Sequence, residues 1–533
     1  MQAVRPALLP GLVALGLLAL LLVGVVGALL GAAPPTSGES LWRDAYLWRV
    51  TLFTIWQASL SAVLAVGLAI PVARALARRS AFPGRTLLLR LFGLPMVIPV
   101  IVAVLGLTAV LGRNGLVNQT LGVLGLPRGD ILYGLSGILI AHVFFNMPLA
   151  TRLLLQVWRA VPGETWRLAS QLGMSSGQIF RLIEWPLIRQ VAPGIVGLVF
   201  LLCFSSFTVV LTLGGGPKAT ILEVAIYQAL RLDFDVARAV TLGLIQLLLC
   251  ALFVAIAQRL ARPAPLAPSA RRPHDRPDVH TPMGRIGDAV AISLAAAVVL
   301  LPLGAVVVAG LNGPVVRVLG GLGLWQATAR SVVVGFSAGL LSLGLGWCLL
   351  LTSREFRVRW WKPGWADGVE WAGSLVLVVS PLVLGAGLFV LLLPLVDVLE
   401  IGLALVVIVN AAMGLPYVVR VLGPALMRVA EQHDRLCEGL GIAGWNRLRL
   451  VEWPAVRRPA ALALALTSAL AMGDLGGIAL FGTEHTATLP LFLYRQMASY
   501  RMGEAAVTAL FLAGLCLIGF LCIERTVGGR DKR

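Results

Sequence analysis

One segment with regularly spaced polar, glycine and proline residues occurs twice in the chain. The first copy is Arg167-Leu-Ala-Ser-Gln-Leu-Gly173 and, after nine residues, Ile183-Glu-Trp-Pro186; the second is Arg435-Leu-Cys-Glu-Gly-Leu-Gly441 and, after nine residues, Val451-Glu-Trp-Pro454. Neither copy gathers the cluster of His, Asp or Glu that an enzyme would need near one face. The repeated pattern therefore indicates a docking surface for a soluble partner.

The residue types of this segment predict two short helices joined at a glycine. Pro162 and Glu164 suit the first turn of a helix, where a missing amide is harmless and a negative charge meets the positive end of the dipole. Leu168 and Leu172, four residues apart, give this helix one apolar face, and Gly173 can take the left-handed conformation that ends it. A second short helix is expected before the proline, so that each copy forms a compact helical knob.

The elements that must carry these segments are membrane spans. With 58% hydrophobic and 13% charged residues, the chain is far more apolar than an ordinary soluble protein. A bilayer core of roughly 30 Å needs about 20 mostly apolar residues per helix. Twelve such stretches are present, near residues 11–30, 51–73, 93–111, 132–155, 193–213, 237–257, 286–311, 331–352, 374–396, 401–421, 460–481 and 504–523.

The net charge of +18 follows the expected membrane topology. If twelve spans alternate from a cytoplasmic N-terminus, most Lys and Arg residues lie in cytoplasmic loops, as the positive-inside rule requires. We therefore expect membrane lipid around the spans, both termini in the cytoplasm, and no nucleic-acid partner. Both copies of the repeated segment then lie on the cytoplasmic side.

The repeat divides the chain into two parallel halves. Gly441 follows Gly173 by 268 residues, and Pro454 follows Pro186 by the same number. An even number of spans in the first half gives the second half the same orientation. A linker rich in proline, alanine and arginine joins them, and we expect it to act only as a tether. The predicted ranges are 1–258 and 286–533 for the halves, 259–285 for the linker, and about 159–189 and 427–457 for the repeated loops.

Few polar side chains interrupt the spans, and one of them is a carboxylate. Asp474 lies in an apolar stretch, where an ionised carboxylate costs roughly 2.5 to 3.5 kcal/mol on insertion scales, so it is expected to face the interior of the bundle. It is either a counter-charge for a cationic substrate or a residue that caps or packs a helix, and the sequence leaves both open. Interhelical hydrogen bonds are expected from His142, Asn146 and Asn410. The outer side is expected to carry Glu223, Asp233 and Asp235.

The sequence predicts no cofactor and no catalytic centre in this chain. The histidines are scattered and no C-x-x-C pair occurs, so neither a metal site nor a disulfide is expected. A phosphate-binding P-loop needs a lysine directly after a glycine, whereas Lys218 follows a proline. Any ATP hydrolysis must therefore be supplied by another chain.

The repeated segment resembles the coupling motif of permease subunits of binding-protein-dependent ABC importers: Glu-Ala-Ala, three residues, Gly, nine residues, Ile-x-Leu-Pro. The glycine, the spacing of nine and the proline are kept in both copies, while Arg stands where Glu is expected. The resemblance implies an all-α polytopic protein with about twelve spans in two parallel six-helix repeats, the type I importer permease fold. It implies that the following residues couple the chain to an ATPase: Arg167, Leu168, Gly173, Ile183, Glu184, Pro186, Arg435, Leu436, Gly441, Val451, Glu452 and Pro454.

Further stretches resemble the fused permeases of bacterial thiamine importers. They include Cys203-Phe-Ser-Ser-Phe207, Ala225-Ile-Tyr-Gln-Ala-Leu230 and Gly473-Asp-Leu475. The resemblance implies a permease in the bacterial inner membrane that imports thiamine, with carriage of its phosphates left open. The implied partners are an ATP-binding cassette ATPase dimer on the cytoplasmic face and a periplasmic substrate-binding protein. We place Asp474, Ser206 and Phe207 on the expected substrate path.

Two other readings remain open at this point. A ferric-iron importer permease shares the fused two-copy architecture. An ion-coupled secondary transporter is also built from repeats, although coupling ions usually need several carboxylates within the membrane and the spans hold essentially one. Dependence of uptake on a co-expressed ATPase separates the importer from the secondary transporter.

Overall fold

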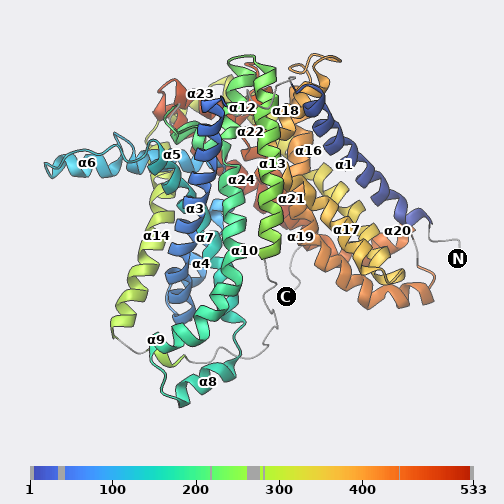
Figure 1. Ribbon diagram of the computed structural model, residues 1–533, viewed down its shortest axis with the longest axis horizontal. Helices are drawn as coiled ribbons and strands as arrows, with labels where there is room; N and C mark the ends of the chain where they lie inside the picture. The colour runs from blue at the N-terminus through green and yellow to red at the C-terminus, as the bar shows by residue number, and fades with distance from the viewer. Residues whose placement is uncertain are drawn as a thin grey trace.

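The computed structural model describes residues 5–33, 43–216, 219–260, 276–279, 282–442 and 444–528. Over these residues the chain is helical and contains no β-strand, which confirms the predicted all-α class. Two bundles of long helices lie side by side, each built mainly by one half of the chain and completed by the first span of the other half (Figure 1).

The first half contains six long helical segments with several short helices between them. Its elements are α1 (Arg5–Gly31), α3 (Ala45–Arg78), α4 (Arg85–Leu91), η1 (Leu94–Met96), α5 (Val100–Leu111), α6 (Leu116–Val123), α7 (Leu135–Arg159), α8 (Gly163–Gln171), α9 (Ser176–Ile179), η2 (Phe180–Glu184), α10 (Trp185–Phe204), α11 (Phe207–Leu213), α12 (Leu222–Arg231) and α13 (Val236–Leu260).

A single 3-10 turn, η4 (Pro277–Val279), is described within the predicted linker, whose residues 261–275 and 280–281 lie outside the described ranges. The second half consists of α14 (Pro282–Leu311), α15 (Val315–Leu319), α16 (Leu322–Arg354), η5 (Glu355–Arg359), α17 (Pro363–Ser374), η6 (Leu375–Val378), α18 (Pro381–Leu392), α19 (Gly402–Gly439), α20 (Gly444–Arg447), η7 (Leu448–Glu452), α21 (Trp453–Gly473), α22 (Gly476–Phe481), α23 (Leu489–Ala498) and α24 (Met502–Gly528).

Eleven described helices are long and apolar enough to cross a membrane, and a bent pair makes a twelfth. Each predicted stretch overlaps one of these segments, so the chain is a multi-pass membrane protein. The predicted span over 374–396 falls on this bent pair, whose two helices, on either side of Ser380, meet at 85°. Ser380 caps α18 by accepting from the amide of Val383, and Pro381 cannot donate to the preceding turn.

Two other predicted spans, 193–213 and 460–481, are also broken. α10 ends at Phe204 and α11 begins at Phe207, while α21 ends at Gly473 and α22 begins at Gly476. The breaks lie at equivalent places, since Ser206 and Asp474 are separated by the repeat offset. At the second break the carboxylate of Asp474 bonds to the amides of Gly476 and Gly477, which competes with a continuous helix.

The first span of each half packs against the other half. α1 lies along α16 and α18, and α14 lies along α5 and α3; Figure 1 shows α1 on the flank of the second bundle. Glycines allow close helix contact within the second bundle: a Cβ on Gly335 or Gly339 of α16 would lie 2.1 Å from Met472 or 2.2 Å from Ser468 of α21. The halves are therefore joined by reciprocal packing as well as by the linker.

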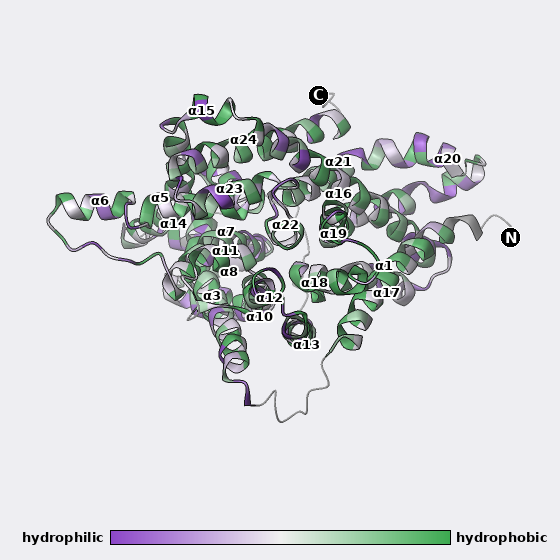
Figure 2. Cartoon of the chain, turned by 90° about the horizontal axis from the view of Figure 1, so that it is seen from above, coloured by the Kyte–Doolittle hydropathy of each residue, from purple (hydrophilic) through white to green (hydrophobic). Residues whose placement is uncertain are grey.

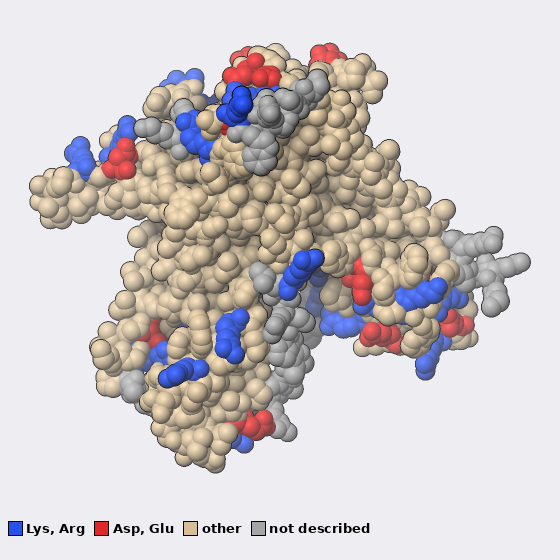
Figure 3. Space-filling model, viewed as in Figure 1, with Lys and Arg blue, Asp and Glu red and all other residues tan. Residues whose placement is uncertain are grey.

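Charged side chains gather toward the two ends of the molecule and leave a wide uncharged band between them (Figure 3). Seen from above, most helices carry hydrophobic residues, whereas hydrophilic residues are concentrated around α20 and α15 (Figure 2). This distribution is the one a bilayer imposes on a polytopic protein.

Candidate functional site

Residues 163–186, here called the first docking element, fold as two short helices joined by a left-handed glycine. α8 begins directly after Pro162, as predicted. Gly173 has φ +61°, and the amide of Met174 donates to the carbonyl of Ala169 at 3.0 Å, which closes the end of α8. The predicted helix-glycine-helix frame is confirmed for this copy.

Residues 431–454, here called the second docking element, have the same turn but a different entry. Gly441 has φ +64°, and the amide of Ile442 donates to the carbonyl of Cys437 at 2.8 Å. α19 continues from the membrane to Gly439 without a break, because Ala430 occupies the position of Pro162 in the first copy. The second element is thus a direct extension of a membrane helix, whereas a proline separates the first element from its span.

Each docking element returns to the membrane through a π-helical turn that ends at the Glu-Trp-Pro sequence. The amide of Trp185 donates to the carbonyl of Phe180, five residues earlier, and that of Trp453 donates to Leu448. The proline that follows each tryptophan cannot donate the regular α-helical hydrogen bond, which favours the wider turn.

The glutamate of each Glu-Trp-Pro sequence is buried and bonded to arginine. Nε of Arg74, near the end of α3, donates to Oε2 of Glu184 at 2.6 Å, and the indole of Trp158 donates to Oε1 at 2.9 Å. In the second copy Glu452 receives a hydrogen bond from Arg354, at the end of α16. Both glutamates therefore anchor their docking element to the second span of the same half, rather than facing a partner.

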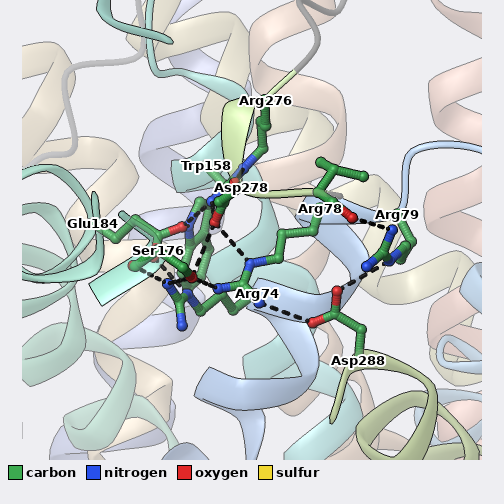
Figure 4. A network of polar contacts seen from close by, with 10 residues as sticks. Arg74, Arg78, Arg79, Trp158, Ser176, Glu184, Arg276, Asp278 and Asp288 are labelled. Carbon is green, nitrogen blue, oxygen red and sulfur yellow. Dashed lines mark hydrogen bonds and ion pairs between the residues drawn. The ribbon is translucent and has the colours of Figure 1, made fainter. Parts of the chain in front are cut away.

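The linker also reaches this site. Nη2 of Arg276 donates to Oε1 of Glu184 at 2.5 Å, and Asp278 lies between Arg276 and Arg78, with Oδ2 3.0 Å from Nε of Arg78 (Figure 4). Asp288 of α14 extends the network, pairing with Arg78 at 3.2 Å. The expectation that the linker acts only as a tether is therefore wrong for its residues 276–278.

Ionisation of Asp278 is maintained by its arginine partners. Burial alone would raise the pKa of this carboxyl, but the hydrogen bonds and charge of Arg276, with Arg78 and Arg74 close by, hold the pKa below its ordinary value. A group with a depressed pKa stabilises the folded contact at pH values above its ordinary pKa of about 3.9, and that stabilisation is lost as pH falls through the folded pKa. The network is thus intact at neutral pH.

The surface that each element presents to solvent is apolar. The apolar face predicted for Leu168 and Leu172 is turned to solvent: they are 56% and 67% exposed, and Trp166 and Ala169 fill the small core under α8. Leucines at the repeat offset are exposed in both copies, namely Leu168 with Leu436, Leu172 with Leu440, and Leu182 with Leu450.

Other residues of the repeated motif surround these leucines. Arg167 and Arg435 are exposed as well, while Ile183 and Val451 are half-buried. Both elements project from the same side of the bundle, the lower side in Figure 1. A duplicated apolar patch with an exposed arginine beside it is suited to contact with two copies of a soluble partner.

A cavity of about 300 Å³ lies between the two halves at the level of the helix breaks. Its lining includes Asp474, Ser206 and Phe207, the three residues predicted for the substrate path, together with residues of α7 and α19. The structure thus brings these three side chains to one space, although they come from different halves of the chain.

Asp474 has a second, local contact set. Its Oδ1 accepts from the amide of Gly476 at 3.0 Å and its Oδ2 from the amide of Gly477 at 2.9 Å. These bonds cap the start of α22 and offset part of the cost of burying the carboxylate. Capping and exposure to the cavity are therefore both present at this residue.

Two further polar residues line the cavity. Glu223 was predicted on the outer side, but it is 1% exposed, and its Oε1 has no hydrogen-bond partner among the described residues. His142 donates to or accepts from Ser61 through Nδ1 at 2.8 Å, and its Nε2 is likewise unpartnered within the described ranges. The burial of Glu223 was not predicted because it results from the packing of the ten-residue helix α12 against α13, α18 and α3, which are distant in the chain or not specified by its local pattern.

Comparison with known proteins extends this description. The family described as binding-protein-dependent transport system inner membrane component matches residues 65–263 and 366–525. The thiamine transport system permease protein ThiP of Brucella abortus (strain 2308) is 47% identical, with 95% of this chain and 93% of that protein aligned. The ThiP protein of Escherichia coli (strain K12) is 44% identical, with 98% and 97% aligned.

A more distant relative is relevant to the alternative that the chain is a ferric-iron importer permease. A Haemophilus influenzae protein named for ferric transport, the permease FbpB 1, is 31% identical over 169 residues, which is 32% of this chain and 26% of that protein. The extended similarity is thus to the thiamine transport permeases, and only a partial one is to the ferric permease. The chain belongs to the family of binding-protein-dependent transport system inner membrane components.

Proposed function

We propose that this chain is the membrane-spanning subunit of an ATP-driven importer that moves thiamine from the periplasm to the cytoplasm of a bacterium. The observation that carries the proposal is the similarity to proteins named as thiamine transport permeases along 95% and 98% of the chain. The chain itself supplies the path and the coupling surfaces, and ATP hydrolysis takes place on a separate ATPase.

The two docking elements support an ATPase dimer as the cytoplasmic partner. Each element offers three exposed leucines at the same relative positions, and both elements project from one side of the molecule. Two equivalent patches on one face are suited to a partner with two equivalent subunits, and less suited to a single subunit. Because this face is cytoplasmic in the proposal, both chain termini lie in the cytoplasm and a substrate-binding protein docks on the opposite, periplasmic side.

The cavity between the halves supports a cationic substrate. Asp474 and Glu223 both line it, and the aromatic side chains of Phe145, Phe207 and Tyr417 lie around the same space. Carboxylates and aromatic faces both attract a cation that has lost its water shell. The thiazolium of thiamine carries a fixed positive charge, so Asp474, Glu223 and Phe207 are the proposed contacts, with Ser206 at the adjacent helix break.

Reconstitution tests the proposal. The chain, its ATPase and its binding protein are placed in proteoliposomes, and accumulation of labelled thiamine is measured with and without ATP. The control is the same system with a P-loop lysine variant of the ATPase, and thiamine pyrophosphate and ferric citrate serve as competitors. ATP-dependent accumulation of thiamine is the expected result.

Each alternative predicts a different outcome of the same assay. Uptake that continues with the inactive ATPase, driven by an ion gradient, would identify a secondary transporter. No accumulation of labelled thiamine, together with ATP-dependent accumulation of labelled ferric iron in the same system, would identify an iron permease. Competition by thiamine pyrophosphate would extend the substrate class to the phosphorylated vitamin.

A further inference from the structure

The second docking element holds its buried glutamate with an arginine of its own. Nε of Arg447, one turn before Glu452, donates to Oε1 at 2.7 Å, and the same guanidinium pairs with Asp434 on α19. Together with Arg354 from α16, two guanidinium groups therefore converge on one carboxylate. Asp434, Arg447 and Glu452 tie the two arms of the element to each other.

The first docking element lacks both of these local partners. At the repeat offset, Ile179 occupies the position of Arg447, and Trp166 occupies the position of Asp434. Ile179 is fully buried in the small apolar core of the element. Glu184 would therefore be left with one arginine, Arg74, if only residues of the first half were available.

The linker supplies the second guanidinium. Arg276 donates to Glu184 at 2.5 Å, and its guanidinium lies 4.3 Å from the centre of the Trp166 ring. Arg276 thus lies between Trp166 and Glu184 in the first element. Arg447 lies in the same way between Asp434 and Glu452 in the second element. A planar guanidinium suits both environments, because it can stack on an aromatic ring and bond to a carboxylate at the same time.

Asp278 fixes the linker in this position. Its carboxylate accepts from Nε of Arg276 at 3.1 Å and pairs with Arg78 of α3 at 3.0 Å. Its Oδ2 also lies 3.5 Å from Oγ of Ser176, in the first docking element. Arg276 and Asp278 are 7% and 4% exposed, so the segment is packed into the site and does not lie loosely on its surface.

We propose that linker residues 276–279 form a clasp that completes the first docking element, with Arg276 taking the role that Arg447 has in the second. The clasp makes the first element as rigid as the second, although a proline separates it from its span. Arg276 is a positioning residue, and its effect on transport rests on the proposed function. The clasp itself is a contact within this chain and can be tested without an ATPase.

A disulfide tests the contact directly. In the full chain, Ser176→Cys and Asp278→Cys are introduced together and mild oxidation is applied in membranes, with mass spectrometry of the linked peptides as the readout. Cross-linking in most molecules is expected, and the control pair Ser176→Cys with Arg285→Cys should not link, because Arg285 is not among the described polar partners of Ser176, which are Arg74, Arg78 and Asp278. Absence of the 176–278 link in a membrane-inserted chain would overturn the clasp, whatever the partner of the chain is.

Substitution of Arg276, followed by transfer of the second element's residue types to the first element, tests the role of Arg276. Arg276→Met is expected to lower thiamine transport per ATP hydrolysed by between about twofold and thirtyfold, the range of a coupling change of about 0.5 to 2 kcal/mol. Arg447→Met should lower it to a similar extent, and Arg285→Met should not.

Adding Trp166→Asp and Ile179→Arg to Arg276→Met recreates the arrangement of the second element. This triple variant should restore the amount of thiamine transported per ATP hydrolysed. If this triple variant does not insert, Arg276→Lys is the second comparison and should retain only part of the coupling, because an ammonium keeps the charge but not the planar contact with Trp166. If Arg276→Met leaves thiamine transport per ATP hydrolysed unchanged, with a normal level of assembled importer, the positioning role is refuted. The cross-link would then establish the contact alone.

Discussion

At the scale of single residues, the two glycines of the docking elements are required for their backbone conformation alone. Gly173 and Gly441 have φ +61° and +64°, and a Cβ added at either position would meet no atom within 4 Å. Any effect of substitution therefore comes from backbone strain and not from a clash. A left-handed conformation costs a residue with a side chain about 1 to 2 kcal/mol, and more for a β-branched one.

We expect Gly173→Val and Gly441→Val to lower transport while the amount of inserted protein stays near that of the unmodified chain. The strain distorts the turn that sets the two helices of each element against each other. The matched control is Gly177→Val, since Gly177 lies in α9 with open space around it and an ordinary helical φ. Transport by the Gly173→Val, Gly441→Val double variant equal to that of the control would contradict the prediction.

The cavity carboxylates allow capping to be separated from substrate contact. Asp474→Asn keeps the shape but loses one of two acceptor oxygens, so α22 should be destabilised by about 1 kcal/mol and thiamine uptake should fall. Glu223→Gln removes charge from a side chain with an unpartnered oxygen in the described structure, so uptake should fall without loss of protein. Uptake divided by the amount of inserted protein is the measurement. If neither ratio changes, these carboxylates do not contact the substrate.

At the scale of elements, the docking surface consists of leucines that point away from the protein. Leu182 and Leu450 are each 63% exposed and lie on the π-helical turns, next to the anchored glutamates. The turns hold the glutamate inward and the leucine outward, because successive residues of a helix face different directions. The ATPase contact is therefore expected to be apolar at its centre, with charged side chains around it.

We expect Leu182→Ser with Leu450→Ser to release the ATPase while leaving the permease folded. Exposed side chains change stability by only about 0.5 kcal/mol or less, whereas each leucine buried at an interface contributes about 1.5 to 3 kcal/mol. Co-purification of the ATPase should thus fall by at least about tenfold. Leu126→Ser, in an exposed loop after α6, is the control. Retention of the ATPase by the double variant would show that it binds elsewhere.

At the scale of the whole molecule, the two halves are held together by packing that does not depend on an unbroken chain. α1 lies on the second bundle, α14 lies on the first, and Asp288 of α14 pairs with Arg78 and Arg79 of α3. The linker adds proximity, and its residues 276–279 add the contacts of the clasp. These two contributions can be separated by the position of a cut.

We expect the halves to restore transport when they are expressed together after a cut between residues 265 and 272. The second half then still carries Arg276 and Asp278, and reciprocal packing of α1 and α14 provides the assembly. The same cut combined with deletion of residues 276–279 should give assembled halves with weaker coupling. Thiamine uptake and co-purification of the halves measure the two effects separately, and equal uptake by both constructions would argue against the clasp.

The sequence by itself determined the membrane class, the twelve apolar stretches, the duplicated elements and the left-handed glycines at 173 and 441. These features depend on local composition or on short-range spacing, which a single pass along the chain contains. The fused two-copy organisation was visible for the same reason, since an offset of 268 residues recurs in the residue types themselves.

Only the tertiary structure decided what depends on partners distant in the chain. The polar residues Ser206 and Asp474 were visible in their apolar stretches, but only the structure shows that the helices break there, and Glu223 is buried because α12 packs beside other helices. Arg276 looked like one of many linker arginines, and its role arises from Glu184 and Trp166, about 90 and 110 residues away. Ion pairs and cavities form between elements brought together by packing, and no local pattern specifies which elements will meet.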